Sequence, residues 1–510
     1  MPDFPGMGEW LARRADRTPS RRALVFEDTT WTYAELNDES ERIATGLRER
    51  GIAPGDRVAY LGVNHPAFIA VMFGCAKLGA IMAPVNWRLS GPEIRFILAD
   101  AGASGLIYDA ALAPAVEAIQ SDLPGKFLVR NDLDIKPVLP GFTVSEESSA
   151  EWPSVPGSQA ALLMYTSGTQ ASPKGAVLTH DNLLSSIISM GCTFGIDPGH
   201  VALVSAPLFH LSGLNVNFLE TFFKGGTVIL ERAFDPGRTL KLMAEHRVNS
   251  FFGAPVMVQM IAEHPDFDDA DLNSLGWVYC GGAPVNEQAV LRCAQRGIPV
   301  CNGYGMTEAA PLISILGPDE AVDKLGSAGK PGFFTDVRIV DELGAEVPAG
   351  TRGEILVKGP SIISGYWNRP EVNAEAFRDG WFHTGDVGVL SEDGYLHVVD
   401  RLKDMIISGG ENIASAEVER CLLEHPRVAD VAVIGKPHEK WGEVPFAFVV
   451  AASGQSITSD EIRAFTAERL ARFKQPAEIE IVASLPRNAT GKLIKHELRR
   501  RLREQSVRDL

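Results

Sequence analysis

The sequence predicts an α/β protein with a large layered N-terminal body, a strand-rich annex and a smaller α+β domain at the C-terminal end. Helical and strand patterns alternate through the first half, and near residue 330 they give way to short strands between Gly- and Pro-rich turns. A compact mixture of helices and strands follows residue 400. A chain of 510 residues is also too long for one ordinary core.

The first clear helix is expected after residues 32–35, Thr-Tyr-Ala-Glu, which have the form of a capping box. Leu36, Ile43 and Leu47 recur at helical spacing, and Gly51 provides a C-terminal stop. The alternation of helices and strands that follows predicts mostly parallel sheets. Strands are expected at residues 56–61, near Val204, at residues 227–230 and at residues 277–279.

Residues 67–85 are nearly all apolar and about long enough to cross a bilayer. Lys77 lies near the middle of this segment, however, and Gly79 and Pro84 interrupt it. A buried helix followed by a strand therefore explains the segment better than a membrane span.

The C-terminal half is expected to begin with an antiparallel or barrel-like annex, whose strands span residues 337–340, 353–358 and 394–399. A domain boundary is placed near residues 400–404. Beyond it the pattern predicts a helix, two strands and a helix, at residues 416–423, 428–434, 446–450 and 459–470. The Arg- and Leu-rich residues 495–508 predict a solvated terminal helix.

Charge and cysteine content restrict the function. The chain carries 48 basic and 65 acidic residues, a net charge of −17, so it is a poor candidate for nucleic-acid binding. Its six cysteines are scattered without a Cys-x-x-Cys pair, which is typical of reduced thiols in a cytosolic protein. The N-terminus lacks the basic start and apolar run of a signal peptide, and a cytoplasmic location is expected.

Residues 166–175, Thr-Ser-Gly-Thr-Gln-Ala-Ser-Pro-Lys-Gly, lie between two apolar stretches and combine hydroxyls, glycines and Lys174. Backbone N–H groups and hydroxyls donate well to phosphate oxygens, and Lys174 adds positive charge. No Gly-Lys-Ser/Thr opens a helix at this point, so the segment is not a Walker A loop. On composition alone, an ordinary surface turn remains open.

Three further segments carry residues suited to a nucleotide. In residues 302–308, Asn-Gly-Tyr-Gly-Met-Thr-Glu, Thr307 suits a phosphate and Glu308 suits Mg²⁺, although Thr-Glu also starts helices. Asp386 ends residues 380–386, and a carboxylate accepts hydrogen bonds from ribose hydroxyls. Arg401 follows Asp400 and suits ribose or phosphate. Taken singly, each residue is more often a turn residue or part of a salt bridge.

Together and in this order, these segments resemble the adenylate-forming superfamily of acyl-CoA synthetases, peptide-synthetase adenylation domains and firefly-type luciferases. The resemblance extends along nearly the whole chain to Lys492, and residues 400–413 look most like bacterial fatty acyl- and aryl-CoA ligases. It implies a large αβαβα N-terminal domain with a β-barrel-like annex, residues 1–402, and a small mobile α+β C-terminal domain, residues 403–510.

The resemblance also implies the reaction. A small-molecule carboxylic acid would react with ATP and Mg²⁺ to give an acyl-adenylate and pyrophosphate, and coenzyme A would then take the acyl group and release AMP. Thr307 would contact the α-phosphate, Tyr304 would stack on adenine, and Thr166 and Glu308 would be the Mg²⁺ ligands. The remaining nucleotide ligands would be Ser167, Gly168, Thr169 and Lys174 at the phosphates, Gly281, Gly282, Ala283 and Pro284 at the adenine, Gly305 next to Tyr304, and Asp386 and Arg401 at the ribose.

By the same resemblance, Lys492 would be the catalytic lysine, stabilising the charge that develops between the acyl carboxylate and the α-phosphate. Lys403 would be the hinge on which the C-terminal domain swings. In one pose this domain would deliver Lys492, and in the other it would present Gly409 and Gly410 to a pantetheine tunnel, where glycine lets the thiol arm approach the backbone.

His210 matches the family's gate beside the acyl carboxylate, with a satisfied core histidine as the alternative. The acyl-pocket walls would come from residues 211–217, 251–254 and 306–311. Asn215 and Asn217 in an otherwise apolar wall suggest a substrate that bears an oxygen, although asparagines often close turns.

The phosphate loop departs from the family pattern, because Gln170 and Ala171 stand where most relatives have Thr and Gly. The Cβ of Ala171 restricts the backbone, and Gln170 replaces a small hydroxyl donor with an amide. Weaker or slower ATP binding is therefore expected, with adenylation retained.

Other functions remain open at this stage. The nearest alternative is an enzyme that transfers the acyl group to an acyl carrier protein or performs only one half-reaction. A luciferase-like oxidation and a scaffold that lost catalysis are more distant alternatives. The sequence leaves open the identity of the acid and the oligomeric state.

Overall fold

The computed structural model describes residues 4–119, 125–142, 151–166, 173–283, 285–408, 411–487 and 493–508. By its internal contacts the chain divides into two compact units. Unit 1 comprises Met1–Asp336 and Val357–Phe382, and unit 2 comprises Val337–Leu356 and His383–Leu510. The boundary between residues 1–402 and a mobile C-terminal domain, residues 403–510, stays a prediction.

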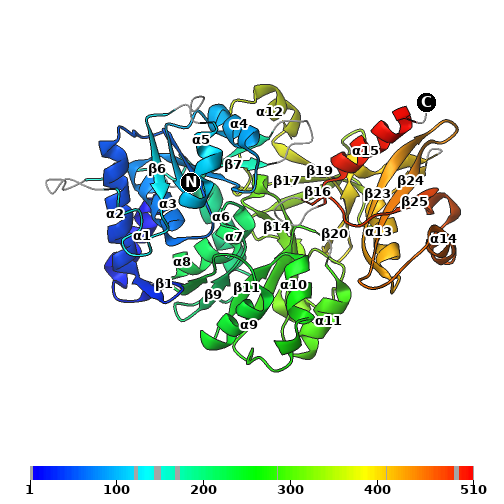
Figure 1. The fold of residues 1–510 in the computed structure, drawn as a ribbon, viewed down its shortest axis with the longest axis horizontal. Coiled ribbons are helices and arrows are strands. Elements are labelled where there is room, and N and C mark those ends of the chain that lie inside the picture. The colour runs from blue at the N-terminus through cyan, green and yellow to red at the C-terminus, as the bar shows by residue number, and fades with distance from the viewer. Residues whose placement is uncertain are drawn as a thin grey trace. The chain divides into compact units, whose positions relative to one another are not determined.

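Unit 1 contains two large sheets (Figure 1). The first has six strands in the order β6-β5-β3-β4-β7-β8, parallel except for the antiparallel β7–β8 pair. Its strands are β3 (Arg57–Leu61), β4 (Ile81–Val85), β5 (Gly105–Asp109), β6 (Phe127–Asn131), β7 (Ala160–Thr166) and β8 (Lys174–Thr179).

The second sheet has nine strands in the order β15-β14-β13-β12-β11-β9-β10-β1-β2. It is parallel from β13 to β1 and antiparallel at both ends, as predicted for its central strands. Its strands are β1 (Arg22–Phe26), β2 (Thr29–Thr32), β9 (Val201–Val204), β10 (Thr227–Leu230), β11 (Ser250–Gly253), β12 (Trp277–Gly281), β13 (Val300–Gly305), β14 (Leu312–Ile315) and β15 (Lys330–Pro331).

Helices alternate with these strands. The predicted capping box is present, because the Thr32 side chain accepts from the Glu35 backbone and Glu35 accepts from Thr32. A π-helix, Leu214–Leu219, connects α7 to α8. The α-helices of unit 1 are α1 (Met7–Arg17), α2 (Tyr33–Glu49), α3 (Pro66–Leu78), α4 (Gly91–Ala101), α5 (Ala113–Glu117), α6 (His180–Gly191), α7 (Leu211–Gly213), α8 (Glu220–Lys224), α9 (Pro236–Glu245), α10 (Pro255–Ala262), α11 (Glu287–Gln295) and α12 (Pro370–Ala376).

The apolar segment at residues 67–85 forms helix α3 and strand β4, as predicted. Every residue of α3 is buried, and the helix packs against α1 and α2. The Lys77 ammonium donates to Asn37 at 2.8 Å and lies 3.3 Å from a Glu41 oxygen, so its charge is paired inside the fold. Among the described residues, no helix is long and apolar enough to cross a membrane.

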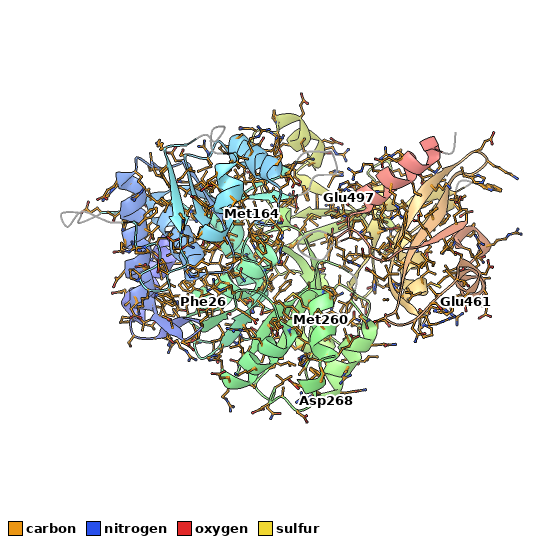
Figure 2. All side chains as sticks on the ribbon, in the orientation of Figure 1. Phe26, Met164, Met260, Asp268, Glu461 and Glu497 are labelled. Carbon is orange, nitrogen blue, oxygen red and sulfur yellow. The ribbon has the colours of Figure 1, made fainter. Side chains whose placement is uncertain are left out.

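Core and surface are well separated in unit 1. Figure 2 places Asp268 at the edge of the molecule, whereas the buried residues Phe26 and Met164 lie within it. The largest buried cluster joins α1, α2 and α3 to both sheets, which gives the strands a rigid support.

The strands predicted for the annex are present. The β19 strand pairs antiparallel with β18 at its start and with β20 at its end. The strands are β16 (Asp336–Val340), β17 (Gly353–Lys358), β18 (Phe377–Arg378), β19 (Trp381–Leu390) and β20 (Leu396–Arg401).

The remainder of unit 2 is the predicted compact α+β structure. Alternation along β23 sends Val431 and Val433 into a core with α13, and Ala432 and Ile434 into a second core with α15. The elements are β21 (Ile406–Ser408), β22 (Glu411–Ile413), α13 (Ser415–Leu423), β23 (Val428–His438), β24 (Gly442–Ala451), α14 (Ser459–Ala467), β25 (Glu478–Ile481) and α15 (Lys495–Arg508).

Candidate active site

The predicted phosphate loop joins two strands of the six-stranded sheet. Thr166 is the last residue of β7 and Lys174 the first of β8, and the two are cross-strand partners. The antiparallel pair therefore holds the Thr166 hydroxyl and the Lys174 ammonium at the two ends of one loop. Ser167, Gly168 and Thr169, together with the atypical Gln170 and Ala171, lie outside the described residues.

Lys174 and Glu308 meet at a residue that the sequence analysis did not single out, Tyr366. The Tyr366 hydroxyl donates to Glu308 Oε1 at 2.8 Å, and Lys174 Nζ lies 5.4 Å from the centroid of the Tyr366 ring. Glu308 is 9% exposed. A cation suited to phosphate and a carboxylate suited to Mg²⁺ are thus held on one aromatic side chain. Tyr366 follows Gly365 between β17 and β18, where no local sequence pattern marks it as a site residue.

Thr307 and Glu308 lie in a short 3₁₀ turn, Thr307–Ala309, that follows β13. Ala310 ends the turn in the left-handed region with φ of 57°, and its carbonyl accepts from Asn215 Nδ2 at 2.6 Å. The Asn215 amide therefore fixes this turn. Asn217 is also used internally, since its Nδ2 donates to the Leu203 carbonyl and its Oδ1 accepts from Ser250. The Oδ1 atom of Asn215, however, is buried without a hydrogen-bond partner, so the suggestion that these amides mark an oxygen-bearing substrate stays a prediction.

The predicted adenine segment leaves the end of β12 next to β13. Gly281 pairs with Gly303, and a Cβ on Gly281 would lie 2.6 Å from the Gly303 carbonyl oxygen, so only glycine fits. Gly282 has φ of 89°, which also favours glycine. Tyr304 and Gly305 continue β13 from Gly303. The structure therefore brings the Gly281–Ala283 segment and the Tyr304 segment to neighbouring strand ends.

His210 precedes α7 and the π-helix, an element that often occurs at functional sites. Its Nε2 atom is buried without a hydrogen-bond partner. Burial, with Arg88 as a smaller cause, lowers the pKa of His210 to about 4. The imidazole is therefore neutral near pH 7. A buried unsatisfied nitrogen suits a polar group of a substrate, but His65 and His180 also have a buried Nε2 without a partner, so the role of His210 beside the acyl carboxylate stays a prediction.

Asp386 and Arg401 are brought together in unit 2. They are cross-strand partners in the β19–β20 pair, and Arg401 Nε lies 3.4 Å from Asp386 Oδ1. Asp386 is buried, and its backbone N–H donates to the Thr384 hydroxyl. The pair offers a fixed carboxylate with a neighbouring positive charge, which suits a ribose next to a phosphate.

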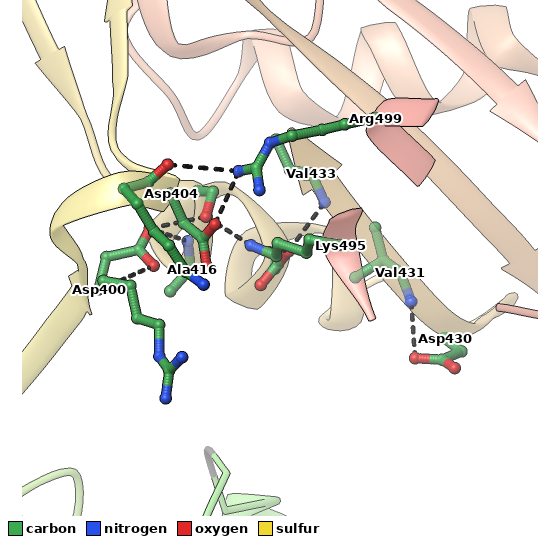
Figure 3. Close-up of polar contacts among 12 residues, drawn as sticks. Asp400, Asp404, Ala416, Asp430, Val431, Val433, Lys495 and Arg499 are labelled. Atoms are coloured by element: carbon green, nitrogen blue, oxygen red, sulfur yellow. Dashed lines mark hydrogen bonds and ion pairs between the residues drawn. The ribbon is translucent and has the colours of Figure 1, made fainter. Parts of the chain in front are cut away.

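Lys403 follows Arg401 in a 3₁₀ turn, Leu402–Asp404. Burial, and secondarily Arg401, lowers the pKa of Lys403. Figure 3 shows the next residue, Asp404, in an ion pair with Arg499 at 2.7 Å. Burial alone would raise the pKa of Asp404, but Lys495 and Arg499 outweigh it and hold the pKa below its usual value.

A polar network ties the segment around Lys403 to helices α13 and α15 (Figure 3). Asp400 accepts from the Ser415 hydroxyl at 2.6 Å and from the Ala416 backbone at 3.1 Å. Lys495 donates to Ser415 at 2.6 Å and pairs with Glu419 at 2.8 Å. The start of α15 is therefore fixed within unit 2. Lys492, Gly409 and Gly410 lie outside the described residues.

The described residues contain no cluster of three His, Cys, Asp or Glu side chains that could hold a metal ion. The residues present fit the Mg²⁺ expected with ATP, because Mg²⁺ is usually held by one or two carboxylates together with phosphates and water. Glu308 supplies such a carboxylate, and its Oε1 is oriented by Tyr366.

Comparison with known proteins points to one family. The family of AMP-binding enzymes matches residues 11–367, and the AMP-binding enzyme C-terminal domain matches residues 417–492. The chain is 47% identical to a feruloyl-CoA synthase of Amycolatopsis sp, over 97% of this chain and 99% of that protein. It is 37% identical to an indoleacetate–CoA ligase of Aromatoleum aromaticum, over 97% of each.

Among solved structures, the o-succinylbenzoate coenzyme A synthetase of Bacillus subtilis with ATP and magnesium superposes with a TM-score of 0.89 and 34% identity, over 98% of this chain and 100% of that one. The same synthetase with its acyl-adenylate intermediate gives a TM-score of 0.88 and 34% identity, over 98% of both chains.

Proposed function

Because the chain belongs to the AMP-binding enzymes, in the acyl-CoA synthetase branch of the adenylate-forming superfamily, we propose that it activates an aromatic carboxylic acid such as ferulate. The enzyme is an AMP-forming acid–thiol ligase that uses ATP, Mg²⁺ and coenzyme A. The acid reacts with ATP to give an acyl-adenylate and pyrophosphate, and the coenzyme A thiol then takes the acyl group and releases AMP.

The choice of acid is supported by the 47% identity to feruloyl-CoA synthase, which extends over 97% of the chain. The indoleacetate and o-succinylbenzoate ligases among its relatives also have aromatic acids in their names. A rigid ring buries a large apolar area at a small cost in conformational entropy, which suits recognition in an apolar pocket.

The residue roles belong to the same proposal. Thr166 and Lys174 bind the phosphates, and Lys174 places a positive charge beside them. Glu308, with Thr166, holds Mg²⁺, which when bound neutralises phosphate charge during nucleotidyl transfer. The contact of Tyr366 with both Lys174 and Glu308 supports a shared site for these groups.

The remaining roles follow the same logic. Asp386 accepts from the ribose hydroxyls beside Arg401. The neutral His210 imidazole contacts the acyl carboxylate through its buried Nε2. Lys492 stabilises the charge that develops between the acyl oxygen and the α-phosphate. Residues 403–510 carry Lys492, which is needed at the site only for adenylation. We therefore propose that these residues move as one body about Lys403 between the two half-reactions.

The co-substrates and the cysteines indicate a cellular compartment for the enzyme. ATP and coenzyme A are cytoplasmic co-substrates, and the described cysteines are all free thiols, as expected in a reducing compartment. We therefore place the enzyme in the cytoplasm.

The test supplies the protein with ATP, Mg²⁺, coenzyme A and a panel of ferulate, indoleacetate, o-succinylbenzoate and straight-chain fatty acids. Adenylates and thioesters are identified by mass spectrometry, with Lys492→Ala as the paired control. Thioester formation with an aromatic acid, lost in Lys492→Ala, supports the proposal. Preferential turnover of a fatty acid contradicts the proposed substrate class. Adenylate that is transferred only to a carrier protein contradicts coenzyme A as acceptor.

A further inference from the structure

Tyr366 contacts both Lys174 and Glu308. Its hydroxyl donates to Glu308 Oε1 at 2.8 Å, and its ring lies under the Lys174 ammonium, with 5.4 Å between Nζ and the ring centroid. Lys174 begins β8 of the six-stranded sheet, whereas Glu308 lies in the turn between β13 and β14 of the nine-stranded sheet. A single aromatic side chain thus connects the two sheets at the site.

The backbone of Tyr366 is fixed from two directions. The Asn373 side chain of α12 accepts from the Tyr366 N–H at 2.7 Å and donates to the Tyr366 carbonyl at 3.0 Å. Tyr366 also forms a bridge with Ala176 of β8. Its position is therefore determined independently of the two side chains that it contacts.

The flanking residues attach the same segment to both partners. The Trp367 N–H donates to the Gly175 carbonyl at 2.8 Å, next to Lys174. The Ile363 N–H donates to the Glu308 carbonyl at 2.9 Å. Backbone hydrogen bonds therefore hold the segment around Tyr366 against Gly175 and against Glu308. They keep the Tyr366 hydroxyl within reach of the Glu308 carboxylate.

The physical effect on each partner differs. A hydrogen bond from a hydroxyl to a carboxylate is charge-assisted, and it selects one rotamer of Glu308. Mg²⁺ requires nearly ideal octahedral geometry, so a misdirected carboxylate is a poor ligand. The ring face attracts the Lys174 ammonium weakly and restricts a long flexible side chain.

We infer that Tyr366 is a positioning residue for adenylation, whose hydroxyl orients Glu308 for Mg²⁺ and whose ring orients Lys174 for the phosphates. This inference rests on the roles proposed above for Glu308 and Lys174. Tyr366 touches neither nucleotide nor metal in this scheme and acts through its two partners.

The test measures nucleotide affinity directly, by calorimetry in the absence of the acid substrate, with Mg²⁺–ATP and with ATP in EDTA. Tyr366→Phe removes the hydroxyl and keeps the ring. It is expected to raise the Kd for Mg²⁺–ATP by about fivefold to tenfold, less than the direct loss of a charge-assisted hydrogen bond to the ligand because Tyr366 acts only through Glu308, and to leave metal-free ATP binding unchanged. Tyr366→Leu removes the ring as well and is expected to weaken metal-free ATP binding too.

A matched control is available at Tyr165. Its hydroxyl donates to the Asp100 carboxylate at 2.8 Å, the same distance and chemistry as in the Tyr366–Glu308 pair. Successive side chains of a strand point to opposite faces, so Tyr165 points away from the face of Thr166. Tyr165→Phe is expected to leave both affinities unchanged, and thermal melting checks that all variants fold.

The outcomes separate this inference from the proposed function. Equal affinities of Tyr366→Phe and the parent protein for Mg²⁺–ATP, with a clear loss in Glu308→Gln, overturn the positioning role alone. An unchanged affinity in Glu308→Gln as well overturns the proposed role of Glu308. Loss of affinity in Tyr366→Phe that is equal with and without Mg²⁺ also overturns the inference, because only a general structural change would produce it.

Discussion

Asp386 and Arg401 face each other across two antiparallel strands, with 3.4 Å between Arg401 Nε and Asp386 Oδ1. The β19–β20 register sets this contact, which no local pattern around either residue indicates. The pair supplies a buried carboxylate whose negative charge is balanced before any ribose binds.

Asp386→Asn is expected to raise the KM for ATP in pyrophosphate exchange by roughly tenfold or more, because hydrogen bonds to a charged group contribute about 1.5–3 kcal/mol. The KM for the acid should change little. Glu392→Gln, in the turn of the same hairpin, is the control and should behave as the parent protein. A normal KM for ATP in Asp386→Asn would remove Asp386 from the nucleotide site.

His210→Ala is expected to raise the KM for the acid about tenfold, with a smaller effect on the KM for ATP, because in the proposed site the imidazole contacts the acyl carboxylate through Nε2. Since burial lowers the pKa of His210 to about 4, adenylation should show no titration of this group between pH 6 and pH 8. The measurement is pyrophosphate exchange against pH in the parent protein and the variant. A rise in the KM for ATP alone would contradict a role at the acyl carboxylate.

Glu220 predicts a pH dependence of stability. The side chain is fully buried, accepts from the Tyr279 hydroxyl at 3.0 Å, and has its pKa raised from 4.5 to about 8 by burial. Between these values the unfolded chain has lost a proton that the folded chain keeps. This group therefore lowers the free energy of unfolding as pH rises from about 4.5 to about 8, by at most about 1.4 kcal/mol per pH unit.

Glu220→Gln removes this titration while keeping the shape of the side chain. Urea denaturation at pH 5.5 and at pH 8 should show a larger loss of stability in the parent protein than in Glu220→Gln. Comparing the change in the free energy of unfolding with pH removes any pH-independent effect of the substitution on stability. Equal slopes would show that Glu220 titrates near its ordinary pKa in the folded protein.

The atypical phosphate loop gives a prediction from sequence. The double substitution Gln170→Thr with Ala171→Gly restores the residues common in relatives and is expected to lower the KM for ATP several-fold, because glycine lets the backbone approach phosphate more closely. Ala171→Gly alone should give part of the gain. Initial-rate kinetics in ATP check both variants, and an unchanged or higher KM for ATP would show that this loop is already adapted to the nucleotide.

Local sequence patterns determined most elements of the fold. The capping box at Thr32 and Glu35 set the start of α2, and periodicity placed α13 and α15 within a residue of their observed bounds. The apolar segment around Lys77 was correctly divided into α3 and β4. These elements could be predicted because hydrogen bonding and side-chain periodicity within a few residues determine them.

The sequence by itself also determined the family, through motifs whose order and spacing agree along the chain. The tertiary structure alone decided that Tyr366 joins Lys174 to Glu308, that Asn215 fixes the turn after Glu308, and that Asp386 pairs with Arg401. These contacts join residues far apart in sequence. They depend on which strands pair and which side chains are buried, and the packing of the whole core sets both of these.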